Sequence, residues 1–146
     1  RPVSRAVALA LRSICLPGEA VAQANRCLYC HDAPCVTACP TGIHIPGFIR
    51  KIATGNVRGS ATRILSANLL GYSCARVCPV EVLCVGACVY NGWHRYPPIQ
   101  IGRLQRYAVE TVFEQNGAAP LFEKAKPAGK RVACVGAGPA SLAAAG

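Results

Sequence analysis

Two stretches, Cys27-Leu-Tyr-Cys30-His-Asp-Ala-Pro-Cys35-Val-Thr-Ala-Cys39-Pro40 and Cys74-Ala-Arg-Val-Cys78-Pro79-Val-Glu-Val-Leu-Cys84-Val-Gly-Ala-Cys88, hold eight of the ten cysteines of the chain. Each block is a run of four cysteines at short spacing, and each contains one Cys-Pro step. A compact iron–sulfur core needs several soft thiolates that converge on it from different directions. The two blocks therefore predict a pair of iron–sulfur clusters, with the rest of the chain serving as a frame.

The spacing suggests how the blocks share the clusters. In the bacterial ferredoxin run Cys-x2-Cys-x2-Cys-x3-Cys-Pro, the fourth cysteine serves the other cluster. The first block here has the same order with a longer middle gap, Cys-x2-Cys-x4-Cys-x3-Cys-Pro. The same logic gives Cys27, Cys30 and Cys35 to a first cluster and Cys39 to a second. By reciprocity, the second block returns one cysteine to the first cluster and keeps the others.

Two other uses of the cysteines compete with clusters. A disulfide framework is typical of small secreted domains, but no secretory segment precedes these tightly grouped cysteines, which favours metal ligation in a reducing compartment, the cytoplasm. Zinc sites usually show paired Cys-x2-Cys knuckles separated by a spacer, and two unbroken runs of four fit that pattern poorly. His31 and His44 are possible zinc ligands, although a lone loop histidine is more often solvated. A zinc-stabilised basic binding module remains the alternative of another class.

Composition bounds the partners. The net charge is +10, but the 16 basic residues are scattered, no basic run exceeds two residues, and aromatic residues are few. This pattern does not favour nucleic acid, and an anionic cofactor or an acidic partner explains the charge at least as well. No apolar run approaches the roughly 18–20 residues of a membrane helix, so we expect no membrane segment. The chain has no Met and stops in the middle of a pattern, so we expect a fragment of a longer protein.

Helical periodicity surrounds the two blocks. The sequence predicts a short helix over 4–12 and further helices over 19–26, 46–54, 57–65 and 100–115, of which the last is the longest. Asn56 is expected to cap the helix that follows it, and residues 68–73 are expected to form a turn. The short connection between the two middle helices favours an antiparallel pair. Cys15 has no neighbouring ligand, and we interpret it as a buried or free thiol.

The longest predicted helix contains a less obvious candidate. Ile101, Leu104, Ala108 and Val112 form its apolar side, whereas Arg103, Arg106 and Glu110 are expected on the polar side. Gln105 falls within the apolar stripe, and a buried amide must find a partner. That partner is either a loop carbonyl, a cluster sulfur, or an iron bound through the amide oxygen. The last possibility would leave one of the eight cysteines spare.

The C-terminal end predicts the first βα unit of a dinucleotide fold. A β-branched run over 131–135 leads into a glycine turn and a helix start, which would present amides to a pyrophosphate. The turn residues are Gly136, Ala137, Gly138, Pro139, Ala140 and Ser141, the last of them standing where a third glycine is usual. Cys134 in the expected strand is interpreted as a small core residue. The expected organisation is thus an uncertain segment 1–16, a helical domain 17–116, a linker 117–130 and a truncated domain 131–146.

Several motifs together resemble one family: Arg26-Cys-Leu-Tyr-Cys, Ile45-Pro-Gly-Phe-Ile, Cys74-Ala-Arg-Val-Cys-Pro, Ile99-x-Ile-Gly-Arg-Leu-Gln105 and Val135-Gly-Ala-Gly-Pro-Ala. They are similar to the N-terminal iron–sulfur domain and FAD-domain start of dihydropyrimidine dehydrogenase, most nearly the small subunit of the bacterial NAD-dependent type. The glutamate synthase small subunit shares the pattern. The spacing Cys78-Pro-x4-Cys84 and Ile45-Pro-Gly-Phe-Ile favour the dihydropyrimidine dehydrogenase branch.

The resemblance implies a mainly α, α-helical ferredoxin-like domain with two 4Fe–4S clusters, followed by the start of a Rossmann-like FAD domain. It implies Cys27, Cys30, Cys35 and Cys88 as ligands of the first cluster. For the second it implies Cys39, Cys78, Cys84 and Gln105, so that Cys74 is not a ligand, and it places Val77 near the flavin.

The expected function is electron transfer within an NAD(P)H-dependent flavin and iron–sulfur oxidoreductase. NAD(P)H would bind beyond this chain, and electrons would pass from FAD through the clusters to an FMN-containing catalytic domain or subunit, in a hetero-oligomer. No residue here is expected to be a catalytic acid or base. A glutamate synthase small subunit is the alternative within the class.

Overall fold

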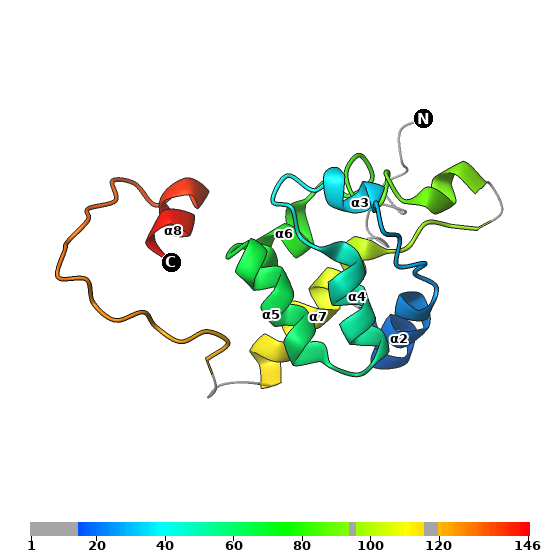
Figure 1. Ribbon diagram of the computed structural model, residues 1–146, viewed down its shortest axis with the longest axis horizontal. Coiled ribbons are helices and arrows are strands. Elements are labelled where there is room, and N and C mark those ends of the chain that lie inside the picture. The colour runs from blue at the N-terminus through cyan, green and yellow to red at the C-terminus, as the bar shows by residue number, and fades with distance from the viewer. Residues whose placement is uncertain (1–14, 94–95, 116–119) are drawn as a thin grey trace.

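The computed structural model describes residues 15–93, 96–115 and 120–146. Its helices form a bundle, from which residues 120–138 run out as an extended segment that ends in a separate short helix (Figure 1). In chain order the helices are α2 (Pro17–Asn25), α3 (Pro34–Thr37), α4 (Ile45–Ala53), α5 (Val57–Ala67), α6 (Gly71–Val77), the 3₁₀ turn η1 (Val89–Trp93), α7 (Ile101–Gln115) and α8 (Pro139–Ala145). The described residues contain no β-strand, so the fold is mainly helical, as expected.

The core lies between α2, α4, α5 and α7. Phe48, Ile49 and Ile52 of α4 are fully buried, and they pack with Ile64 of α5 and Leu104 of α7. This burial follows from the apolar stripes of the sequence, because helices of this length are held by packing of one apolar face and not by propensity alone.

Helix ends are set by the residues that cap them. The Asn56 side chain accepts a hydrogen bond from Gly59 N at 2.8 Å, which confirms the predicted cap of α5. At the start of α2, the Glu19 carboxylate accepts a hydrogen bond from Leu16 N. His44 caps α4 by accepting from Gly47 N at 3.0 Å, so this candidate zinc ligand has a local structural role.

Four expectations differ from the structure or fall outside it. The turn predicted over 68–73 ends early, because α6 begins at Gly71, whose Cα lies so close to Ile64 and Leu65 that a Cβ there would come within 2.8 Å of Ile64 Cγ2. The strand predicted over 131–135 is not formed, since a strand needs a hydrogen-bonding neighbour. Cys134 in that segment is exposed and is not a core residue. The helix predicted over 4–12 lies outside the described residues.

Glu110 is a further difference. We expected it on the polar side of α7, yet its residue exposure is only 5%. The reason is α6, which packs against α7 on that side and was not predicted from the sequence. Cys15, in contrast, is a free thiol buried in the core, which confirms the interpretation given for it.

The α4–α5 contact provides a test of the packing. Ser60 Oγ, fully buried on α5, donates a hydrogen bond to Phe48 O of α4 at 2.9 Å. We predict that Ser60→Ala lowers the free energy of unfolding by about 1 kcal/mol, the usual net value of one such bond. Ser66→Ala is the matched control, because Ser66 is on the same helix, is exposed, and bonds only to Arg63 O of its own helix among the bonds that the structure gives it. Urea unfolding followed by circular dichroism measures both, and equal losses would contradict the prediction.

Candidate iron–sulfur site

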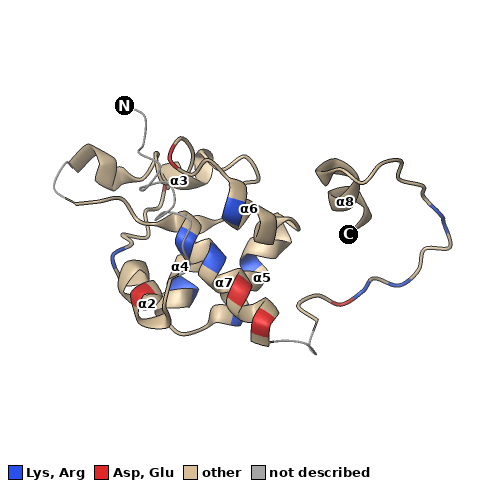
Figure 2. Cartoon of the chain, turned by 180° about the vertical axis from the view of Figure 1, so that it is seen from behind, with Lys and Arg blue, Asp and Glu red and all other residues tan. Residues whose placement is uncertain are grey.

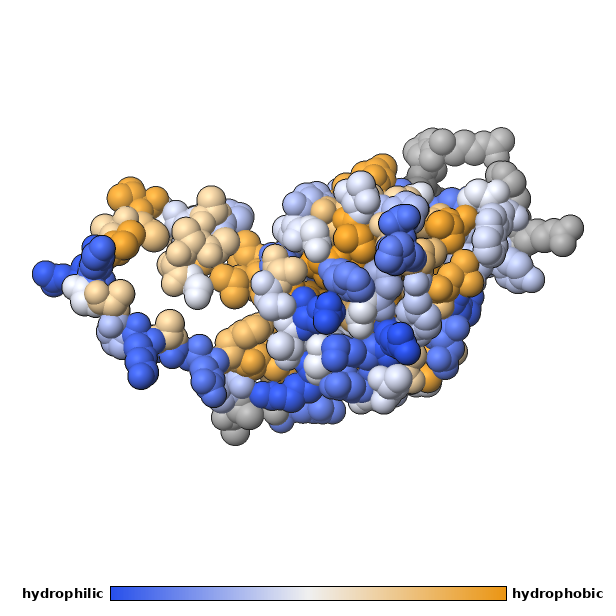
Figure 3. Space-filling model, in the orientation of Figure 1, coloured by the Kyte–Doolittle hydropathy of each residue, from blue (hydrophilic) through white to orange (hydrophobic). Residues whose placement is uncertain are grey.

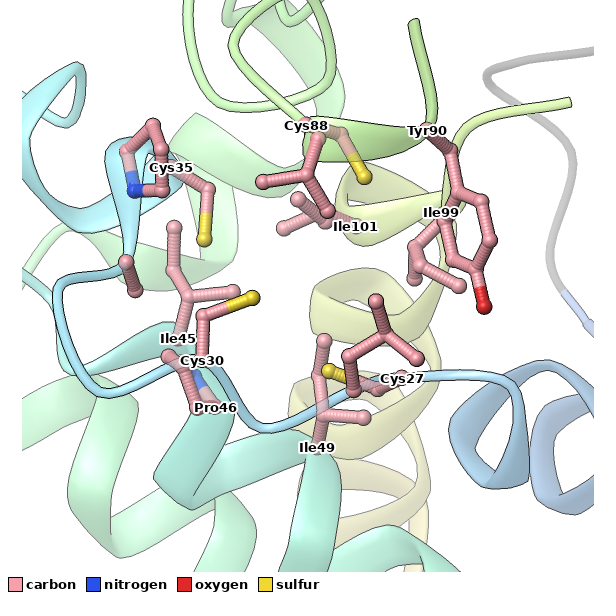
Figure 4. Close-up of a pocket in the computed structure, with 14 residues that line it drawn as sticks. Cys27, Cys30, Cys35, Ile45, Pro46, Ile49, Cys88, Tyr90, Ile99 and Ile101 are labelled. Atoms are coloured by element: carbon pink, nitrogen blue, oxygen red, sulfur yellow. The ribbon is translucent and has the colours of Figure 1, made fainter. Parts of the chain in front are cut away.

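The two cysteine blocks form two adjacent groups of thiols. Cys27, Cys30, Cys35 and Cys88 surround one pocket, in which the three cysteines of the first block face the last cysteine of the second (Figure 4). The other lining is apolar and includes Ile45 and Ile49 of α4 and Ile101 of α7. Sulfurs from both blocks are thus gathered over the buried ends of the core helices.

Local backbone geometry aims the first block at this pocket. Tyr29, between Cys27 and Cys30, has a φ of +52°, which is unusual for a residue other than glycine. Its hydroxyl donates to Ala24 O at 3.2 Å, which anchors the turn on α2. Burial raises the pKa of Cys27, while a hydrogen bond from the Tyr29 amide to the sulfur opposes the rise. Sequence spacing gave no signal for this conformation, because nothing but its position within Cys-x2-Cys marks Tyr29.

A second contact joins the end of the second cysteine block to the start of the first. Tyr90, just after Cys88, donates its hydroxyl to Arg26 O at 2.8 Å, and the Arg26 guanidinium lies 5.4 Å from the centre of the Tyr90 ring. Arg26 immediately precedes Cys27. This link holds the end of the second block against the start of the first, across more than 60 residues of sequence.

The second group contains the remaining four cysteines of the blocks. Burial, together with the neighbouring thiols of Cys74 and Cys39, raises the pKa of Cys78 to about 11. Burial also raises the pKa of Cys84 to about 12, with Cys39, Cys35 and Cys78 among its electrostatic neighbours. Because Cys84 interacts electrostatically with Cys39 of its own group and with Cys35 of the first group, the two groups of thiols lie next to each other.

Cys39 differs from Cys78 and Cys84, because its pKa is lowered and not raised. Burial alone would raise its pKa, but hydrogen bonds from the Thr41 hydroxyl and from the amides of Ile43, Thr41 and Gly42 outweigh burial and lower it. The Thr41 contact is 3.4 Å long, and Gly42 has a φ of +63°, which allows the loop to fold back over the sulfur. Amides directed at a sulfur stabilise a thiolate, the form that binds metal.

The turn that separates Cys84 from Cys88 is also tightly built. A Cβ on Gly86 would lie 2.2 Å from Glu81 O, so only glycine fits there. Asn91 Nδ2 donates to both Val85 O and Gly86 O, at 2.7 and 2.8 Å. These contacts direct Cys84 and Cys88 to different groups although only three residues separate them.

Gln105 of α7 and Cys74 of α6 each have a hydrogen-bond partner close to the start of α6. Gln105 is buried, and its Nε2 donates to Gly71 O at 2.9 Å, so the amide oxygen is the end left to face another partner. Cys74 accepts a hydrogen bond from Asn68 Nδ2 at 3.1 Å. The structure thus gives Gln105 a backbone-carbonyl partner, at the first residue of α6 and not in a loop, and this bond uses only the amide nitrogen.

The donor set suits a cluster better than a single ion. Within residues 15–93, 96–115 and 120–146, no three His, Cys, Asp or Glu side chains are placed to hold one metal ion. Zinc bound at about 2.3 Å by four thiolates would draw the sulfurs to within about 3.8 Å of one another. Four thiols surround one apolar pocket, and burial raises the pKa of Cys27 and, to about 11, that of Cys35. This arrangement instead fits a larger cationic core that compensates the charge of the thiolates.

The candidate flavin residues are placed less completely. Gly136 has a φ of +99°, and Gly138 precedes the first turn of α8, so the glycine turn and helix start are present without the strand. Ser141 Oγ donates to Val135 O at 3.3 Å. Val77 ends α6 and is 68% exposed, so it is accessible to a neighbouring domain.

Among the helices that the structure describes, none combines the length and the apolar character that a membrane crossing requires.

Comparison with known proteins gives the family. The family described as dihydropyrimidine dehydrogenase domain II, 4Fe-4S cluster, matches residues 10–117. The NAD-dependent dihydropyrimidine dehydrogenase subunit PreT of Salmonella typhimurium is 44% identical over 126 residues, which cover 86% of this chain and 30% of that protein. PreT of Escherichia coli K12 is 45% identical over 123 residues, 84% of this chain and 29% of that protein.

A second kind of relative is also similar. The small chain of glutamate synthase (NADPH) from Escherichia coli K12 is 38% identical over 126 residues, 86% of this chain and 26% of that protein. The chain therefore spans less than a third of the length of these relatives. Because the family match covers most of the chain and includes both cysteine blocks, this protein belongs to the 4Fe-4S domain family of dihydropyrimidine dehydrogenase.

Proposed function

We propose that this chain is the electron-transfer module of an NAD(P)H-dependent flavin and iron–sulfur oxidoreductase of the dihydropyrimidine dehydrogenase type. The observation that carries the proposal is the meeting of Cys27, Cys30, Cys35 and Cys88, from both blocks, around one apolar pocket. The family and the relatives, which are subunits of oxidoreductases, support the same class. All ten cysteines are free in the structure, which suits a reducing cytoplasm.

Two 4Fe–4S clusters are proposed. Cys27, Cys30, Cys35 and Cys88 would hold the first, and Cys39, Cys78, Cys84 and Gln105 the second. When bound, the clusters would supply one-electron transfer between a flavin and a partner. The protein's own contribution is to exclude water with isoleucines around the first group and to direct amides at the sulfur of Cys39.

We also propose a flavin site and a partner. The glycine turn from Gly136 to Ser141 would contribute part of an FAD site, and exposed Val77 would lie near the flavin. NAD(P)H would bind to the flavin domain, and an FMN-containing catalytic domain or subunit would accept the electrons in a hetero-oligomer. The second candidate is a glutamate synthase small subunit, which the 38% identity to that protein supports.

Metal analysis tests the proposal directly. Protein purified without oxygen should contain about eight iron and about eight sulfide per chain, and a broad visible absorption that fades when dithionite is added. Cys134→Ser is the control and should leave these values unchanged, because Cys134 is exposed and lies in neither group. Zinc in a colourless protein would contradict the proposal and support a zinc-stabilised module.

Substitutions of Gln105 and Cys74 test which of these two residues is a ligand of the second cluster. We predict that Gln105→Ala removes or alters one cluster and keeps the other, because only the second group loses its oxygen donor. Gln105→Glu keeps an oxygen and should retain the iron while changing the reduction potential of that cluster. Cys74→Ser should leave the iron content of both unchanged. Electron paramagnetic resonance of the reduced protein measures each cluster, and loss of iron in Cys74→Ser but not in Gln105→Ala would reverse the assignment.

A further inference from the structure

A buried acid pairs with two arginines at the α6–α7 contact. Glu110 of α7 is 5% exposed, and its Oε1 accepts hydrogen bonds from Arg76 Nη2 of α6 and from Arg106 Nε of α7, the latter at 2.9 Å. Figure 2 shows the acidic positions of α7 among basic positions on the helices around it. Glu110 is therefore the carboxylate that forms an ion pair between the two helices.

Arg76 is held on its other sides as well. Its guanidinium lies 3.6 Å from the centre of the Tyr72 ring, and its Nη1 donates to Tyr72 O at 2.9 Å. The Tyr72 ring in turn meets the Phe113 ring of α7 edge-on, with 5.1 Å between centroids. Arg76 thus has one geometry in which its ring contact, its backbone contact and its ion pair are all satisfied.

The position of Arg76 connects this network to the candidate site. α6 has only seven residues, too few to be stable without tertiary contacts. It begins at Gly71, whose carbonyl accepts the hydrogen bond from Gln105, and Cys78 follows directly after its last residue. α6 is therefore attached to α7 at its start by Gln105 and near its end by Arg76 and Glu110.

A buried charge is a costly way to gain stability alone. Apolar residues of similar volume often replace a buried ion pair without loss, whereas a charged contact is directional and can fix one arrangement of two elements. The Arg76–Glu110 pair joins α6 to α7, and a directional contact of this kind can fix how far one helix is turned and shifted along the other. The same two helices carry Gln105 and lead into Cys78, so their relative position decides whether both can reach one cluster.

We propose that Glu110 is a positioning residue for the second cluster: through Arg76 it holds α6 against α7, so that Cys78 and Gln105 face the same cluster. The inference rests on the proposed function, because it concerns ligands proposed there. It assigns Glu110 no contact with the cluster and no part in proton transfer.

Substitution of either partner tests the inference in the whole chain purified without oxygen. Glu110→Gln and Arg76→Met should each alter or remove the resonance signal that Gln105→Ala alters, with iron reduced by up to half, and leave the other cluster's signal unchanged. Glu114→Gln is the matched control, because it removes the same charge from an exposed position of the same helix. It should behave like the unsubstituted protein.

The double variant distinguishes positioning from general stability. If Glu110 acts through Arg76, Glu110→Gln combined with Arg76→Met should be no worse than the more severe single variant. Additive effects, equal loss of both clusters, or unchanged signals in both single variants would overturn the inference. Should Glu110→Gln fail to fold, Arg76→Lys decides, because lysine keeps the charge but cannot donate to Tyr72 O and to Glu110 from two guanidinium nitrogens. A change confined to the resonance signal of the second cluster then supports positioning. An unsubstituted protein without iron would instead refute the proposed function.

Discussion

The structure depends on bringing the end of the second cysteine block back to the start of the first. Cys88 and Cys27 are far apart in sequence, yet they border one pocket, and the hydrogen bond from Tyr90 to Arg26 O holds the two segments together. The helices between the blocks make this return possible, because α4 and α5 pack into a core on which both blocks rest. Figure 3 shows that apolar residues also reach the surface between the charged ones on one face of this body.

Much of this arrangement could be predicted from the sequence. Apolar stripes gave the core helices α4, α5 and α7, and Asn56 marked a helix start, because these signals are local and depend on side-chain period or capping. The doubled cysteine block with Cys-Pro steps pointed to the family that the comparison shows. The ligand assignment, including Gln105, remains a prediction.

What the sequence could not give depends on contacts between distant segments. Glu110 has the same residue type and spacing as an exposed charge, and only the packing of α6 against α7 buries it. Tyr29 adopts a left-handed backbone for which no propensity signal exists in tyrosine. The β-branched run over 131–135 is suited to a strand, but no neighbouring strand is present among the described residues to pair with it.

α3 has a consequence for how the two thiol groups are related. This single helical turn contains Cys35, which lines the first pocket, and leads directly to Cys39, which neighbours Cys78 and Cys84. The spacing between Cys35 and Cys39 is therefore fixed within a few covalently joined residues, whereas the places of Cys78 and Gln105 depend on how α6 packs on α7. A shift of the surrounding helices would leave the spacing between these two cysteines unchanged, so the part of an electron's path that runs between them is protected from the breathing motions of the bundle.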